Sequence, residues 1–221
     1  RARADMPSEA TLVVMARCPA AGRCKRRLAR DLSQMLQHPG AAEQAAHIQR
    51  QLTRHTLAVA KRLEQEEQLE VVLAVSGAGP RAALRWARSL DVSNVRLQGS
   101  GGLGTRLRRQ LLLSRRNDNP TLVIGTDLPW LNRRDLLAAI EMLQRSDLVL
   151  GPAADGGYWL IGVSSELLRR PAHWPLSGIP WGGDQVLAST LKQASDRGVS
   201  TLLLGERNDL DQLADLRPWL G

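Results

Sequence analysis

The chain is predicted to be an α/β protein of three layers, in which helices cover both faces of a mostly parallel β-sheet. Short apolar runs rich in β-branched residues alternate with amphipathic stretches of helical length along its 221 residues. Strands that alternate with helices in this way favour a parallel sheet. No Pro/Gly/Ser-rich linker, internal repeat or low-complexity tract divides the sequence. We therefore expect a single domain over residues 11–221, with residues 1–10 forming a disordered tail.

Seven strands are expected, each at a short apolar run bounded by Gly, Pro or polar residues. The first, TLVVMA at residues 11–16, is almost wholly apolar, which is typical of a strand buried on both faces. The remaining strands are expected at residues 70–77, 95–98, 121–127, 148–153, 158–163 and 201–206.

Helices are expected between these strands. The first is indicated by apolar residues on one helical face, and the chain leaves it at the His-Pro-Gly sequence of residues 38–40. Its apolar face consists of Leu28, Leu32, Met35 and Leu36. Further helices are expected at residues 41–67, 81–90, from about 104 to 115, 132–145, 184–198 and from 210 onward. For two of them the sequence also predicts the ends: Asn132 with Asp135 three residues later, and Asp184 as an N-cap with Gly198 as a stop.

The composition excludes some classes of protein. No stretch approaches the ~18 consecutive apolar residues of a membrane-spanning helix, so no membrane span is expected. Cys18 and Cys24 are the two cysteines of the chain, too few for a disulfide framework, and the four histidines form no metal-binding signature. A reducing, cytoplasmic location is the simplest expectation.

The chain is strongly basic, with a formal net charge of +8. Its basic residues are spread over most of the sequence, and aromatic residues make up only 3% of it, so stacking platforms for a nucleic acid are scarce. We expect no nucleic-acid partner. Of the 30 basic residues only three are lysines, and Lys25 lies in a Gly/Pro-containing loop. A lysine kept in such a loop favours a need for a point charge, as in phosphate binding.

The loop between the first strand and the first helix is a candidate phosphate site. It contains Gly22, Lys25, Arg26 and Arg27 directly before the helix. Free N–H groups and the dipole at a helix start attract anions, and arginine can bind two phosphate oxygens at once. The alternative is a solvated basic loop, because the segment matches neither a P-loop nor a Rossmann fingerprint.

A second glycine-rich segment, GSGGLG at residues 99–104, precedes an arginine-rich helix. Glycine permits close approach of the backbone to a ligand, so Gly104 is a candidate contact. Arg106 is the arginine nearest this turn and would bind an anion there. The alternative is a flexible loop followed by an exposed helix face.

Two aspartates follow strand-like runs at the point where Gly or Pro ends the run. Asp127 lies before Leu-Pro in TLVIGTDLP, and Asp155 lies before Gly-Gly-Tyr. The carboxyl ends of strands are where ligands bind in open α/β sheets, and carboxylates suit Mg²⁺ or Mn²⁺. Each could instead serve a turn, Asp127 by capping local N–H groups and Asp155 within a β-turn between two strands. Asp211, or its neighbour Asp209, is a further candidate metal ligand, with N-capping of the last helix as the alternative.

Taken in order, these segments resemble the motifs of one bacterial family. RCPAAGRCKRRL (17–28) resembles K-x-P-x-x-G-x-x-K-T-R-L, and GLGTR (102–106) resembles D-L-G-x-R. GTDLP (125–129) matches G-[ST]-D-x-P, PAADGGYWLIG (152–162) matches P-x-x-D-G-G-Y-x-L-I-G, and IPW (179–181) and DLD (209–211) complete the order. The family consists of GT-A-fold, glycosyltransferase-like proteins associated with radical-SAM gene neighbourhoods. It is related to phospholactate guanylyltransferase and, more distantly, to molybdenum-cofactor nucleotidyltransferases.

The chain departs from the family motifs at three positions. Arg17 stands where the family has lysine, Arg26 where it has threonine, and Gly102 where it has aspartate. The two cation changes keep or add positive charge, so the anion-binding expectation stands. The lost hydroxyl and carboxylate put the contacts to the base or ribose in doubt. The resemblance covers about residues 11–216 and implies the nucleotide-diphospho-sugar transferase fold, whose N-terminal half holds the nucleotide.

The motifs and the resemblance together predict a transferase that uses Mg²⁺ or Mn²⁺, a nucleotide or nucleotide-sugar donor and a small-molecule acceptor. Glycosyl transfer from an NDP-sugar is favoured over nucleotidyl transfer with release of pyrophosphate. A non-catalytic nucleotide-binding protein is the third alternative. The catalytic candidates are Lys25, Asp127 and Asp155. The phosphate-binding candidates are Gly22, Lys25, Arg27, Gly104 and Arg106, and the metal-binding candidates are Asp127, Asp155 and Asp211. No oligomeric state is predicted.

Overall fold

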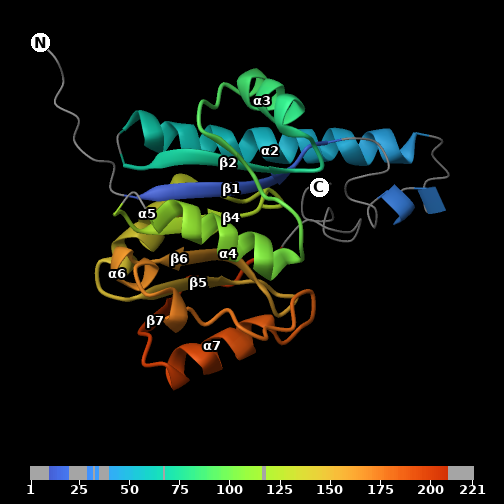
Figure 1. Cartoon of the computed structure of the whole chain (residues 1–221). Helices are drawn as coiled ribbons and strands as arrows, with labels where there is room; N and C mark the ends of the chain where they lie inside the picture. The colour runs from blue at the N-terminus through green and yellow to red at the C-terminus, as the bar shows by residue number, and fades with distance from the viewer. Residues whose placement is uncertain are drawn as a thin grey trace, which may run out of the picture.

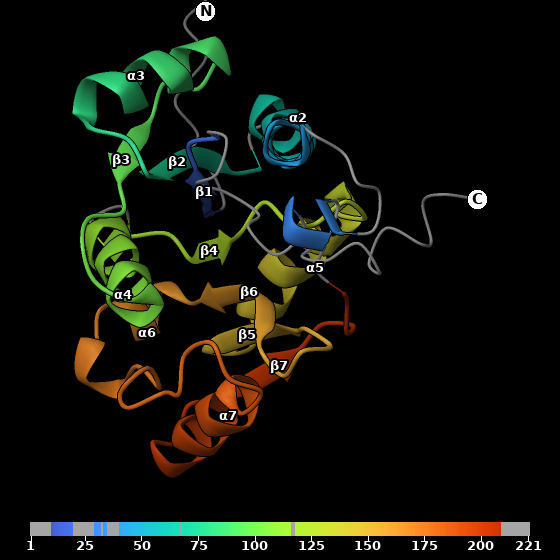
Figure 2. The same ribbon diagram turned by 90° about the vertical axis from the view of Figure 1, so that its right-hand side faces the viewer.

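The fold is built on a seven-stranded sheet with the strand order β3-β2-β1-β4-β6-β5-β7 (Figures 1 and 2). The structure, a computed structural model, describes residues 10–19, 29–31, 33–34, 40–66, 68–115 and 118–208. The strands are β1 (Thr11–Arg17), β2 (Glu70–Ser76), β3 (Val95–Leu97), β4 (Thr121–Ile124), β5 (Leu148–Pro152), β6 (Tyr158–Val163) and β7 (Thr201–Leu203). All seven predicted strands are confirmed.

The sheet is mostly parallel, as predicted. β1 pairs in parallel with β2 and β4, β2 with β3, and β5 with β7. Only β6 is antiparallel to its neighbours β4 and β5 among these strands, because a tight turn at residues 153–157 connects β5 directly to β6. The carboxyl ends of the parallel strands therefore meet the start of β6 at one edge of the sheet.

Side chains of the central strands alternate between two cores, one on each face of the sheet. In β1, Leu12 and Val14 enter the first core, whereas Val13 enters the second. All three are fully buried. Burying a leucine or valine side chain contributes about 1.5–3 kcal/mol relative to leaving it in water, so the two-sided burial of β1 explains its apolar sequence.

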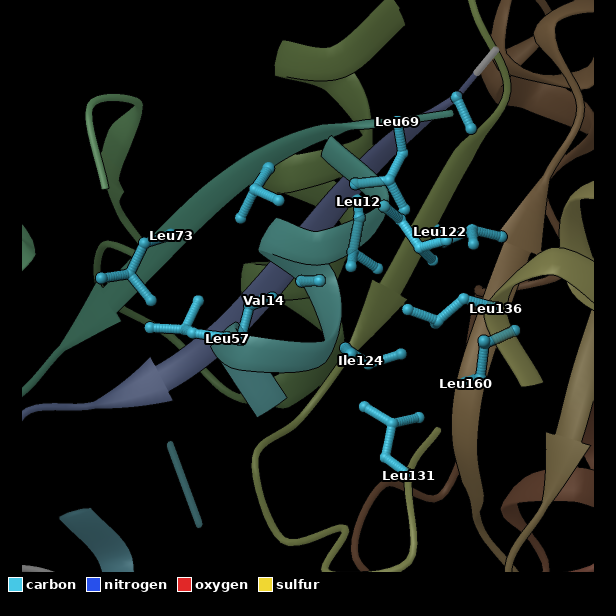
Figure 3. Packing of buried hydrophobic residues seen from close by; sticks show 14 of the residues in the cluster. Leu12, Val14, Leu57, Leu69, Leu73, Leu122, Ile124, Leu131, Leu136 and Leu160 are labelled. Carbon is cyan, nitrogen blue, oxygen red and sulfur yellow. The ribbon is translucent and has the colours of Figure 1, made fainter. Parts of the chain in front are cut away.

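Helices cover both faces, which gives the predicted three layers (Figure 2). The first core is closed by α2 (Ala41–Gln65), α3 (Pro80–Ser89) and α5 (Arg133–Leu143). The second core is closed by α4 (Leu103–Ser114), α6 (Ser165–Leu168) and α7 (Val186–Asp196), with a 3-10 turn at Pro171–His173. In the first core, Leu57 of α2 and Leu136 of α5 belong to the same cluster of buried side chains as Leu12 and Leu122 of the sheet (Figure 3). None of the helices in the described ranges is both long and apolar enough to cross a membrane.

The predicted start of α5 is confirmed, and that of α7 is wrong. The Asn132 side chain accepts from the Arg134 N–H at 2.9 Å, and Asp135 accepts from the Asn132 N–H at 3.0 Å, which forms a capping box. α7 begins two residues later than expected, after Gln185 and without a side-chain cap, so Asp184 is not its N-cap. The Asp184 carbonyl lies instead against Gly156 of the β5–β6 turn.

Both strands that precede the candidate aspartates are shorter than predicted. β4 ends at Ile124, because the Thr126 side chain turns away to bond with α2. β5 ends at Pro152, where the pairing with β6 changes register, since proline has no N–H to donate to the ladder. Asp127 and Asp155 thus lie in loops, each three residues beyond the end of its strand.

The predicted first and last helices fall largely outside the described residues. Residues 29–31 and 33–34 are helical, in agreement with the first of these predictions. The apolar face predicted for that helix (Leu28, Leu32, Met35 and Leu36) and the helix predicted from Leu210 lie outside the residues that the structure describes.

Candidate active site

A cavity of about 470 Å³ lies at the edge of the sheet where the parallel strands end. This edge is the usual ligand-binding position of open α/β sheets. Three predicted site residues, Arg106, Asp127 and Asp155, line the cavity together. Arg17 and Ser76, the last residues of β1 and β2, also line it. The structure therefore brings these predicted site residues to one place.

Asp127 is presented to the cavity by a loop whose other residues are anchored. Thr126 is 4% exposed, and its Oγ1 accepts a hydrogen bond of 2.8 Å from Nε2 of Gln49 in α2. Leu128 is 2% exposed in the first core, and its carbonyl accepts from the Leu131 N–H at 3.1 Å. With both neighbours fixed, Asp127 is half-buried and faces the cavity.

Asp155 lies in a second loop, the tight turn between β5 and β6. Its Oδ1 accepts from the Gly157 N–H at 2.9 Å, which is the bond of an Asx turn. Gly156 has a φ of +88°, and a Cβ there would lie 2.0 Å from the Asp184 carbonyl oxygen. The Gly156 carbonyl accepts from the Leu187 N–H of α7 at 2.9 Å. The turn role of Asp155 is thus present in the structure, and its exposed carboxylate also lines the cavity.

Arg106 reaches the cavity from the first turn of α4. Its Nε donates to the Gly101 carbonyl at 3.0 Å, and its Nη1 donates to Oε1 of Gln98 at 3.3 Å. Both acceptors are neutral, and no carboxylate in the described part of the chain forms a salt bridge with this guanidinium. Arg133 and Arg169, by contrast, are paired with Glu66 and Asp118. Within the described ranges, the positive charge of Arg106 therefore has no carboxylate to offset it.

Gly104, the other candidate of this segment, has a packing role. A Cβ at Gly104 would lie 2.1 Å from Nε1 of Trp181, so the indole rests directly on the start of α4. Gly104 does not line the cavity in the described residues, whereas Trp181 does. Contact between the Gly104 backbone and a ligand stays a prediction.

One end of the cavity is apolar. We call this the apolar end; it comprises residues of α4, β6, α7 and the loop before α7, namely Leu103, Leu107, Tyr158, Ile161, Trp181 and Val186. The Tyr158 and Trp181 rings meet edge to face, with centroids 6.2 Å apart. Burial raises the pKa of the Tyr158 hydroxyl well above its usual value, so this group is protonated at neutral pH. Leu103 is 48% exposed at the start of α4 and offers apolar surface to a bound molecule.

The part of the cavity toward β3 in the strand order is polar, and sequence reasoning missed part of it. This polar end comprises Arg17, Ser76, Gln98 and Arg106, from the ends of β1, β2 and β3 and from α4. Gln98 was expected only as the last residue of a strand. The strand-end rule that identified the aspartates would have found it. Gln49, which also lines the cavity, has no such signal, because it lies in the middle of a long polar helix.

Several predicted site residues lie outside the described part of the chain: Gly22, Lys25, Arg27 and Asp211. The chain enters the first of these segments just after Arg17, which lines the cavity. The second segment follows Asn208, whose carbonyl accepts from Nε1 of Trp130 at 2.6 Å, close to the Asp127 loop. Within the described ranges, no group of three or more His, Cys, Asp and Glu side chains is arranged to hold a metal ion.

The fold and the cavity define a class of protein: a three-layer α/β protein with a mostly parallel sheet and its candidate site at the carboxyl edge of that sheet. Residues 56–183, more than half of the chain, match the family DUF2064, described as an uncharacterized protein conserved in bacteria. The chain belongs to this family. No curated protein sequence matches the chain.

Solved structures share this fold at low sequence identity. A protein from Desulfovibrio desulfuricans G20, provisionally assigned as a nucleotide-diphospho-sugar transferase, is 22% identical with a TM-score of 0.77, over 93% of this chain and 83% of that chain. A 4-diphosphocytidyl-2C-methyl-D-erythritol synthase from Anaerococcus prevotii is 12% identical with a TM-score of 0.58, over 95% and 96%. A manganese complex of Rv0371c from Mycobacterium tuberculosis is 20% identical with a TM-score of 0.51, over 96% and 98%. At these identities the likeness establishes the fold.

Proposed function

We propose that this protein is a metal-dependent transferase that uses a nucleotide donor, and that it transfers a glycosyl group from an NDP-sugar. The observation that carries the proposal is one cavity with an arginine held only by neutral oxygens and two carboxylates. The arginine suits the negative charge of phosphate groups, and the carboxylates suit the cation that accompanies a diphosphate.

The phosphate groups of the donor would bind at the polar end. Arg106 has Nη2 and one Nη1 hydrogen available, because its other hydrogen bonds go to Gly101 and Gln98. We expect Lys25 and Arg27 of the first loop to add charge, with backbone N–H groups near Gly22 also contacting phosphate oxygens. We assign these residues to the diphosphate because they form a basic segment that follows Arg17, a residue of the polar end, in the sequence.

The carboxylate oxygens of the cavity fit a Mg²⁺ or Mn²⁺ ion. Mg²⁺ in phosphoryl sites is held by one or two carboxylates, with substrate phosphates and water completing the coordination. Asp127 and Asp155 line the same cavity, and Oδ2 of Asp155 is not used in its turn. We assign Asp127 as the main ligand, with Asp155 or Asp211 in support; the manganese in one structure of the same fold is consistent with this choice. When bound, the ion would offset the charge on the leaving diphosphate.

In this proposal the residues of the chain act mainly by positioning. The acceptor hydroxyl attacks the anomeric carbon of the sugar, the bond from that carbon to the phosphate oxygen breaks, and the nucleoside diphosphate leaves. Arg106 holds the diphosphate oxygens in place. Asp155, exposed and lining the cavity, is the group we assign to accept the proton of the acceptor hydroxyl, which leaves the support of the metal to Asp211.

The apolar end favours glycosyl transfer to an uncharged acceptor. A nucleotidyltransferase that acts on a phosphorylated acceptor needs cations on the acceptor side of its site. Among the described lining residues the cations are Arg17 and Arg106, both at the polar end. The apolar end offers Leu103, Tyr158 and Trp181 instead, which suits an alcohol with an alkyl or aromatic body.

Calorimetric titration with a panel of nucleotides and NDP-sugars in the presence of Mg²⁺ tests the proposal, followed by product analysis. Binding of an NDP-sugar with transfer of its sugar would support it. Release of pyrophosphate from an NTP would replace glycosyl transfer by nucleotidyl transfer. Binding without turnover of any donor in the panel would identify a non-catalytic nucleotide-binding protein.

A further inference from the structure

The side chain of Gln98 bonds with β1, with β2 and with Arg106 of α4, and these bonds define its orientation. It follows β3 directly and is 3% exposed. Its Nε2 donates to the carbonyl of Ala16 in β1 at 3.2 Å and to the carbonyl of Ala74 in β2 at 2.8 Å. A primary amide nitrogen has two hydrogens, so both are used by the strands. The amide oxygen therefore points away from the sheet, toward Arg106.

Arg106 is held by two neutral oxygens, which bind two of the three nitrogens of its guanidinium. Oε1 of Gln98 accepts from Nη1 at 3.3 Å, and the Gly101 carbonyl accepts from Nε at 3.0 Å. Arg109, one turn further along α4, donates to the carbonyls of Gln98 and Ser100 and so fixes the turn that carries these acceptors. These bonds use the Nε hydrogen and one hydrogen of Nη1, so Nη2 and the second Nη1 hydrogen stay available to a ligand in the cavity that Arg106 lines.

We propose that Gln98 is a positioning residue that aims the guanidinium of Arg106 at the phosphate groups of the donor while leaving its charge unpaired. The inference rests on the proposed function, because it takes phosphate as the ligand of Arg106. A neutral acceptor is required for this task. A carboxylate at position 98 would pair with Arg106 and reduce its attraction for phosphate, whereas an apolar side chain would release the arginine into many rotamers.

A double-mutant cycle between Gln98 and Arg106 tests the inference, with inorganic pyrophosphate and Mg²⁺ as the probe in calorimetric titrations. Gln98→Met should weaken pyrophosphate binding about tenfold, the equivalent of one hydrogen bond to a charged group. Gln98→Glu should weaken it further. In an Arg106→Met background, Gln98→Met should cause no additional loss, because the amide acts through the arginine.

Gln110→Met is the matched control. Gln110 lies on the same helix as Arg106, is fully buried, and its Nε2 donates to the Leu97 carbonyl at 3.2 Å, but it does not line the cavity. This variant should bind pyrophosphate like the wild type. Arg106→Lys adds a test that leaves Gln98 in place, so it stays informative if Gln98→Met does not fold. Lysine keeps the charge but lacks the planar fork, so this variant should weaken pyrophosphate binding about as much as Gln98→Met.

The possible outcomes separate this inference from the proposed function. If Arg106→Met weakens binding but Gln98→Met and Arg106→Lys do not, Gln98 does not position the arginine and only this inference fails. Independent, additive losses in the double variant would overturn it as well, as would wild-type affinity in Gln98→Glu. If the wild type does not bind pyrophosphate, or Arg106→Met binds it normally, the phosphate site itself is wrong and both fail.

Discussion

The two loops that carry Asp127 and Asp155 share a sequence pattern but are stabilised in different ways. In the Asp127 loop the flanking residues are anchored: Thr126 bonds to Gln49 of α2, and Leu128 is buried in the first core. In the β5–β6 turn the aspartate itself accepts from the Gly157 N–H, while Gly156 lies against Asp184 and its carbonyl accepts from the Leu187 N–H of α7. A strand followed by an aspartate and glycine or proline can therefore mean a presented carboxylate, a turn-forming carboxylate, or both.

The largest effect is expected for Asp127→Asn. Loss of the charge should abolish Mg²⁺-dependent nucleotide binding and lower turnover by at least about 100-fold, since a cation on the leaving group is worth several kcal/mol. The free energy of unfolding should change by less than about 1 kcal/mol, because the neighbouring residues anchor the loop. Titration with and without Mg²⁺ measures the first effect, and denaturant unfolding measures the second. Unchanged Mg²⁺-dependent affinity would exclude Asp127 as a metal ligand.

Gly156→Ala tests the other half of the comparison, that glycine and not only aspartate holds the β5–β6 turn. A Cβ would collide with the Asp184 carbonyl at a positive φ, so we expect the free energy of unfolding to fall by about 3 kcal/mol. Gly182→Ala is the matched control: Gly182 has a φ of +86° but no atom within 4 Å of a Cβ. It should lose only about 1 kcal/mol. Equal losses in the two variants would mean that the contact with Asp184 adds nothing.

Asp155→Asn separates charge from turn formation. Asparagine keeps the oxygen that accepts from the Gly157 N–H, so the free energy of unfolding should stay the same while turnover falls about tenfold or more through loss of the proton acceptor. Asp155→Ala should lose the same activity and also about 1 kcal/mol of stability. Normal turnover in Asp155→Asn would leave this residue with its turn role alone.

The smallest effect concerns Tyr158, the residue that follows the turn and the single tyrosine of the chain. Burial raises its pKa, so the folded protein keeps the hydroxyl proton at a pH where the unfolded chain loses it. The contribution of this hydroxyl to the free energy of unfolding is therefore fully present below the ordinary tyrosine pKa of about 10, and it is lost as the pH rises above that value. Phenolate absorbance of the folded protein should appear only at a higher pH than in the unfolded chain. A titration like that of free tyrosine would mean that water reaches this end of the cavity.

The fold was predictable to a large extent because burial acts on runs of sequence. Strands such as β1 and β2 are apolar on both faces, and each was located to within a residue. Errors arose at the ends, where a single contact decides. β4 stops at Ile124 because Thr126 bonds with Gln49, which is 77 positions away in sequence. The start of α7 depends on how the 156–157 turn docks against it, and no local pattern contains that information.

The site was predictable where it depends on strand ends and glycine, and not where it depends on distant partners. Arg106, Asp127 and Asp155 were selected from local motifs, and they line one cavity. Their individual roles remain predictions. The role inferred for Gln98 depends on two bonds: one to the Ala16 carbonyl, 82 positions earlier in the chain, and one from Arg106 of the next helix. The role of a buried amide can be inferred only when its hydrogen-bond partners in the folded chain are known.

The bonds of Arg106 and Arg109 to backbone carbonyls change the meaning of the high net charge. Arg197 likewise donates to the Trp174 carbonyl, and Arg108 stacks over the Trp174 ring at 5.1 Å. In these positions arginine works as a neutral-acceptor cross-link that joins loops to helices, a task lysine cannot perform with the same geometry. The basicity of a protein of this composition and its attraction for polyanions are therefore separate properties. Replacing Arg109 or Arg197, which do not line the cavity, to lower the isoelectric point would loosen loops before it altered ligand affinity.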